Sequence, residues 1–101
     1  MKKLPIACQL TAAEIEARRK GLLPGLLAQA QERVPVENGF RWRLAPSGEI
    51  LAAVAKTIDA ERRCCRFLKF VLTIESDEGS IWLEITGPPG TAEFLDVLCR
   101  D

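Results

Sequence analysis

Apolar residues recur along this chain with two periods, one typical of helices and one typical of strands. Between residues 11 and 32, Leu and Ile recur at spacings of three, four and seven, which predicts an amphipathic helix. Thr11 and Glu14 form a capping box that opens this helix. Pro24 removes one backbone hydrogen bond, so we expect a kink or two shorter helices.

After residue 32 the period changes to two. Apolar residues alternate over 34–36 and 40–44, on either side of Asn38-Gly39, which predicts a β-hairpin with a type I′ turn. Ser47 then predicts the N-cap of a second helix, because its hydroxyl can accept from an amide of the first turn. We expect this helix to end at about residue 64 or 65.

The last third of the chain predicts a second hairpin and a final helix. Strand formers fill 67–74, turn residues fill 76–79, and apolar residues alternate over 81–85. The breaker sequence at 87–90 ends the second strand, and Thr91 opens the last helix.

The element order, helix-hairpin-helix-hairpin-helix, predicts a single α+β domain over residues 1–101. We expect two layers, with a mostly antiparallel four-stranded sheet covered by helices on one face. The segment before Thr11 is a candidate edge strand. A chain of this length buries enough surface to fold without disulfides or a structural metal.

Charge and composition exclude several partners. The chain has 14 basic and 14 acidic residues, so no broad attraction to nucleic acid or to an anionic membrane is expected. A basic strip is therefore interpreted as a solvated face. It comprises Arg18, Arg19, Lys20, Arg41 and Arg43. The N-terminal apolar stretch is too short and too polar for a signal peptide, which predicts a cytoplasmic protein with reduced thiols.

The absence of His narrows the chemistry further. Without it, Ser/His/Asp and Cys/His nucleophile pairs and Cys/His zinc patterns are excluded. We assign no catalytic residue, and an enzymatic function is disfavoured.

The adjacent pair Cys64 and Cys65 carries most of the functional information. It lies where the second helix gives way to a strand, and a helix that unwinds there would turn both thiols toward one pocket. The neighbouring Arg62, Arg63 and Arg66 favour the thiolate, whereas the helix dipole and burial oppose it. The alternative is structural, because Cys is often buried and Cys65 falls on the apolar face of its helix.

Thiolates are soft ligands, so a site made of Cys prefers Hg(II), As(III), Cu(I) or Zn(II) to Mg(II) or Ca(II). Cys8 is a candidate third ligand that would complete a trigonal site, and a small buried residue is its alternative interpretation. Cys99 is interpreted as a packing residue of the last helix.

Several residues also match a known sequence pattern. The pattern consists of an acidic residue before Cys-Cys-x-Phe, then a strand that contains Phe, and then Gly-Pro-x-Gly before a short helix. The matching residues are Glu61, Cys64, Cys65, Phe67, Phe70, Gly87, Pro88 and Gly90, with an early Cys-x-Leu-Thr at 8–11. The chain thereby resembles a group of short, uncharacterised bacterial proteins associated with heavy-metal-resistance settings. The resemblance covers most of the chain and implies a fold and a thiol-bearing corner, but no reaction. Arg66 stands where that pattern has Pro.

The leading hypothesis is a cytoplasmic protein that binds a soft metal ion or metalloid through Cys64 and Cys65, with Cys8 as the candidate third ligand. The alternative is a non-catalytic interaction or regulatory module with structural cysteines, which would form a homodimer through the sheet face near Trp82. A redox enzyme that cycles a Cys64-Cys65 disulfide ranks last, because adjacent Cys form a small, strained ring.

Overall fold

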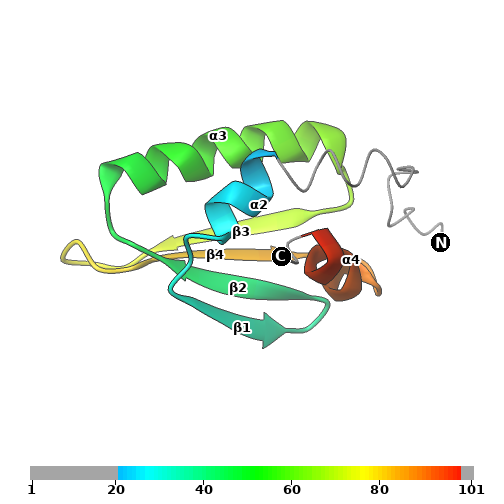
Figure 1. Ribbon diagram of the computed structural model, residues 1–101. Coiled ribbons are helices and arrows are strands. Elements are labelled where there is room, and N and C mark those ends of the chain that lie inside the picture. Colours follow the sequence, from blue (N-terminus) through cyan, green and yellow to red (C-terminus); the bar gives the residue numbers. More distant parts are fainter. Residues whose placement is uncertain (1–20, 99–101) are drawn as a thin grey trace.

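The computed structural model describes residues 21–98, which form three helices and a four-stranded sheet (Figure 1). In chain order the elements are α2 (Leu22–Leu27), β1 (Glu32–Val36), β2 (Gly39–Leu44), α3 (Gly48–Cys64), β3 (Lys69–Ile74), β4 (Ile81–Thr86) and α4 (Thr91–Leu98). The strand order is β1-β2-β4-β3, and all neighbours are antiparallel. The α+β prediction is confirmed. The predicted helix start at Thr11 and the candidate strand before it lie outside the described residues.

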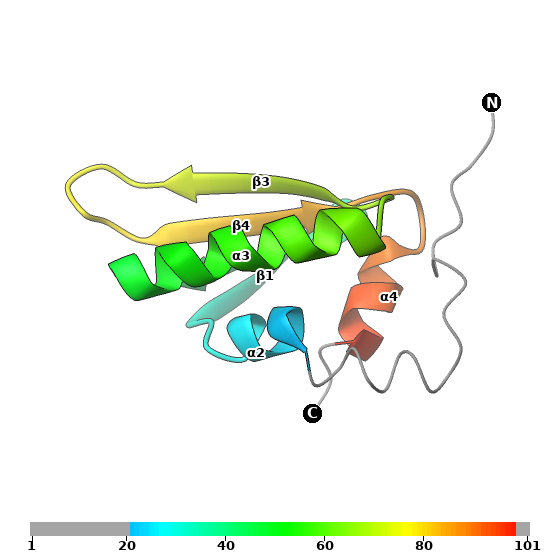
Figure 2. The same cartoon turned by 90° about the horizontal axis from the view of Figure 1, so that it is seen from above.

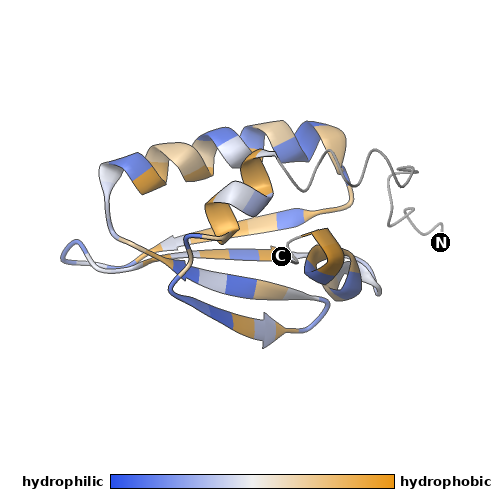
Figure 3. Ribbon diagram, viewed as in Figure 1, coloured by the Kyte–Doolittle hydropathy of each residue, from blue (hydrophilic) through white to orange (hydrophobic). Residues whose placement is uncertain are grey.

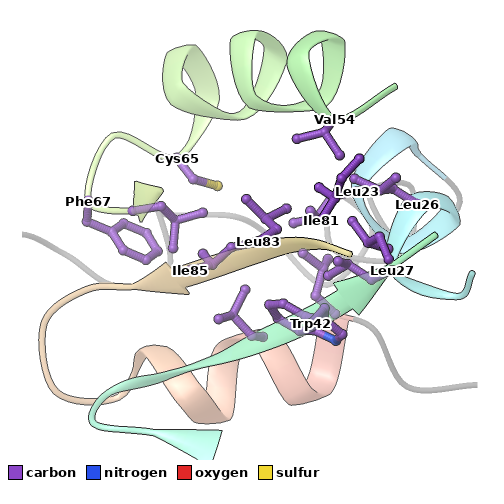
Figure 4. Close-up of a cluster of buried hydrophobic side chains, with 14 residues drawn as sticks. Leu23, Leu26, Leu27, Trp42, Val54, Cys65, Phe67, Ile81, Leu83 and Ile85 are labelled. Carbon is purple, nitrogen blue, oxygen red and sulfur yellow. The ribbon is translucent and has the colours of Figure 1, made fainter. Parts of the chain in front are cut away.

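One face of the sheet carries the core. Trp42 of β2 pairs with Leu83 of β4, and the flanking pairs Phe40 with Ile85 and Leu44 with Ile81 place their side chains on that same face. These strands alternate as predicted, because Ile81, Leu83 and Ile85 are buried while the residues between them are half-buried. The three helices lie over this face, and Figure 4 shows their side chains meeting those of the sheet.

Helix α3 starts where the sequence predicts. The hydroxyl of Ser47 accepts a hydrogen bond from the Ile50 amide at 3.1 Å, which confirms the predicted N-cap. The apolar residues Leu51, Val54, Ala55 and Ile58 predict one buried side for this helix, but Ala55 is exposed, while Thr57 and Glu61 are buried with Val54. The spacing 54, 57 and 61 is helical, so the stripe includes polar residues that a search for apolar ones misses.

The first hairpin corrects one prediction. Val36 pairs with Gly39, so the two turn residues are Glu37 and Asn38 rather than Asn38 and Gly39. Only Asn38 adopts a positive φ, of 60°, whereas a type I′ turn requires two such residues. Gly39 is required for a different reason, because a Cβ there would overlap the backbone carbonyl of Ile85 on β4.

α2 tolerates Pro24 within its first turn, and β3 begins two residues later than predicted. Pro24 lies in the first turn of α2, where a helix amide has no partner within the helix, so its missing N–H costs little. β3 begins at Lys69, and the preceding Phe67 and Leu68 are buried in the connection from α3. Within residues 21–98, no helix is long and apolar enough to cross a membrane.

Candidate functional site

The vicinal cysteines mark the end of the long helix α3. Cys64 is its last helical residue, and Cys65 leaves the helical conformation with φ of −112° and ψ of 81°. The Cys65 amide still donates to the Glu61 carbonyl oxygen at 2.7 Å, and the Cys65 carbonyl accepts from the Leu68 amide at 3.1 Å. The corner that leads from α3 into β3 is therefore held by backbone hydrogen bonds on both sides of Cys65.

The two cysteines lie in opposite environments. Cys64 is exposed, whereas Cys65 is fully buried and belongs to the core cluster. In Figure 4 the sulfur of Cys65 points into the core, toward Leu83. The described conformation thus presents one thiol to solvent and packs its neighbour as a small apolar side chain, in contrast to the expected pair facing one pocket.

The arginines around the pair are engaged differently from expectation. Arg62 and Arg63 both bind the carboxylate of Asp59, with N–O distances of 2.8 and 3.0 Å. The hydrogen bond from Arg62 is the main reason that the pKa of Asp59 lies below its ordinary value, and the charges of both arginines add to it. Asp59 therefore holds both guanidinium groups about one helical turn before the cysteines, rather than beside the thiols. Arg66 lies exposed in the corner beyond them.

Glu61 is a site residue whose position the sequence analysis did not use. Its side chain is only 5% exposed, and it precedes Cys65 by four residues, on the same side of α3. The helical spacing from Val54 through Thr57 to Glu61 was the available signal, since it places the carboxyl on the buried stripe. The Glu61 carboxyl is therefore buried on the side of α3 that faces the core, one turn before Cys65.

A metal site at this corner requires more ligands than the described residues supply. Within residues 21–98, no group of three or more Cys, Asp or Glu side chains is close enough to hold a metal ion. Cys8, the candidate third ligand, and Cys99 both lie outside that range. Of the proposed metal ligands, residues 21–98 thus include only Cys64 and Cys65.

The other proposed contact surface, around Trp82, is already partly covered. Trp82 lies on the sheet face opposite the core and is half-buried. The guanidinium carbon of Arg41 lies 4.0 Å from the centre of its ring, as in a cation–π contact. This arrangement makes Trp82 a poor candidate for a bare aromatic platform.

Comparison of the chain with protein-family models, with curated proteins and with solved structures finds no match. The fold and the corner themselves define the class, a small α+β domain with a vicinal cysteine pair where its long helix ends.

Proposed function

We propose that this protein binds a soft metal ion or metalloid, in the cytoplasm, through the thiolates of Cys64 and Cys65. The observation that supports this function is the position of the pair at the end of α3, where the backbone leaves the helix and one thiol is exposed. Hg(II) and As(III) fit best, because both favour low coordination numbers and soft sulfur ligands. Cys8 is the candidate for the third position.

Binding through both sulfurs requires Cys65 to turn out of the core. Burying an apolar side chain contributes about 1.5–3 kcal/mol, and the cavity that Cys65 would leave behind adds to the cost of moving it. Zinc-finger peptides, which supply four ligands, release about 10–16 kcal/mol on binding zinc. We propose that two or three bonds from sulfur to a soft metal ion likewise exceed the cost of moving Cys65. Because protons compete for sulfur, the affinity is expected to fall as the pH is lowered.

Native mass spectrometry of the reduced protein tests this function. The protein is given limiting Hg(II), As(III), Cu(I) or Zn(II) in the presence of a competing small thiol. We expect the wild type to retain one equivalent and the Cys64→Ser/Cys65→Ser variant to retain none. Cys99→Ser is the matched control, and Cys8→Ser reports whether a third sulfur contributes. Equal retention by the wild type and the double variant would contradict the proposal.

A second function is favoured by the complete burial of Cys65. We propose as the alternative a non-catalytic interaction module in which the cysteines are structural. Loss of every metal to the competing thiol, in the wild type as in the variant, is the result expected of this function.

A further inference from the structure

The two edges of the sheet differ in how they are protected against pairing. β1 carries Pro35, which has no N–H to donate, and the charged Glu32 and Arg33. β3 has neither Pro nor Gly, and Lys69 is its only charged residue. Its outer side has no neighbouring strand among residues 21–98, and the view from above shows it along the margin of the sheet (Figure 2). Within the part of the chain that the structure describes, β3 is therefore the less protected of the two edges.

β3 is also the most apolar exposed segment of the described chain. Five large apolar side chains between residues 21 and 98 are notably exposed, and three of them lie in this strand. They are Val71 at 37%, Leu72 at 38% and Ile74 at 53%. Figure 3 shows apolar colour along most of β3. Exposed, apolar edge strands are typical pairing sites.

The hydrogen bonds to β4 indicate which backbone groups of β3 point outward. The Glu75 amide donates to the Ser80 carbonyl at 3.0 Å, immediately beyond the pair Ile74 and Ile81. In an antiparallel ladder, hydrogen-bonded pairs alternate with non-hydrogen-bonded ones. The amides and carbonyls of 71 and 73 thus face β4, and those of 70, 72 and 74 face away from the sheet.

We propose that β3 pairs antiparallel with β3 of a second copy of this chain, about a two-fold axis through Leu72. Such an axis keeps the helices of both copies on the same face, so each residue must pair with one of the same parity. Leu72 then meets Leu72 of the second copy, and Phe70 meets Ile74. The result is one sheet of eight strands. This dimer deepens the second function proposed above by naming its surface and its partner.

The charges of Lys69 and Glu75 favour this register and favour a second copy of the chain as the partner. With the axis at Leu72, Lys69 lies opposite Glu75 of the second copy, and the symmetry repeats this pair at the other end of the interface. Two neighbouring registers are also allowed. An axis at Val71 places Lys69 opposite Thr73 and Glu75 opposite the buried Phe67, and an axis at Thr73 places Lys69 opposite Asp77 but Glu75 opposite Val71. Of the three registers, only that at Leu72 gives both Lys69 and Glu75 an opposite charge.

Sedimentation equilibrium of the full chain under reducing conditions tests the dimer. The wild type is expected to reach about 22 kDa, twice its 11.2 kDa mass, as concentration rises. Leu72→Lys brings two ammonium groups together on the axis and is expected to keep the protein at the monomer mass. Val97→Lys, which changes an exposed apolar residue of α4, is the matched control and leaves the dimer intact.

A charge exchange tests the register itself. Lys69→Glu alone and Glu75→Lys alone each set like charges opposite one another and weaken the dimer about tenfold. Mixing the two variants is expected to give a heterodimer, because every pair is then of opposite charge. The double variant Lys69→Glu/Glu75→Lys is expected to dimerise like the wild type.

Three results would overturn the inference. The first is a mass of 11.2 kDa at all concentrations, and the second is a dimer that Leu72→Lys leaves unchanged. The third is a monomer in which the amides of 70, 72 and 74 exchange slowly, because another segment of the same chain then covers this edge. The metal-retention experiment is separate from all three, so failure of the dimer leaves the metal-binding function to be judged by itself.

Discussion

β3 and β4 form one hairpin with the same alternation of apolar residues, yet their burial is opposite. Leu72 of β3 pairs directly with Leu83 of β4, but Leu83 is fully buried and Leu72 is 38% exposed. Both side chains lie on the helix-covered face, so alternation indicates the correct face in each strand. The alternation within a strand therefore predicts on which face of the sheet a side chain lies. Whether that side chain is buried depends on whether a helix or another strand covers it.

The largest expected effect contrasts these two paired leucines. Leu83→Ala is expected to lower the free energy of unfolding by about 3 kcal/mol, because it leaves a cavity in the core. Leu72→Ala at the strand edge is expected to cost less than about 1 kcal/mol. Both are measured by urea unfolding in the Lys69→Glu background, which weakens the proposed dimer. Equal costs would show that β3 is as well covered as β4.

The two adjacent cysteines give the same comparison, between a buried and an exposed side chain, in neighbouring residues. Cys65→Ser places a hydroxyl in the core and is expected to lower the unfolding free energy by about 1–3 kcal/mol. Cys64→Ser makes the same chemical change at an exposed position and is expected to stay within about 0.5 kcal/mol of wild type. Urea unfolding with a chelator and a reductant measures both. Two equal losses would argue against the burial of Cys65 alone.

The capped start of α3 is expected to matter less than its buried end. Ser47→Ala removes the acceptor for the Ile50 amide and is expected to cost about 1 kcal/mol. Ser47→Asp retains an acceptor and serves as the control, with a stability near that of the wild type. Thermal unfolding followed by circular dichroism measures both variants, and a loss of similar size in Ser47→Asp would contradict a capping role.

The smallest expected effect concerns the exposed side of α3. The pKa of Asp59 is lowered in the folded chain, mainly by the hydrogen bond from Arg62. Its contribution to stability is therefore present above the unfolded pKa, near 3.8, and is lost as the pH falls through the lower folded value. Asp59→Asn is expected to lower Tm by no more than about 2 °C at pH 7, and by less in high salt. A difference that persists at pH 2 would contradict this origin.

Local chemistry made much of the fold predictable. Ser47 marks the start of α3 through its side-chain oxygen, Thr91 is the first residue of α4 as predicted, and the alternation at 81, 83 and 85 follows from a strand with one covered face. The turn at Glu37 and Asn38 was misplaced by one residue, because Gly39 serves a close approach between strands that local sequence does not encode.

The candidate site was less predictable than the fold. Its cysteines were found from their adjacency, but their orientations depend on the backbone dihedrals at which α3 ends, which sequence spacing does not supply. The roles of Arg62 and Arg63 likewise depend on Asp59, one turn earlier, which binds both of them. Metal binding and dimerisation stay predictions until the experiments above are done.

The short connection between α3 and β3 joins the cysteine pair to the edge strand of the proposed dimer. Only residues 65 to 68 separate the helix from the strand, and the hydrogen bond from the Leu68 amide to the Cys65 carbonyl spans them. A ligand that moves Cys65 out of the core therefore displaces this connection and the start of β3. Thermodynamic reciprocity then fixes the sign: if metal loading loosens the pairing of two copies, pairing must weaken the affinity for metal by the same factor.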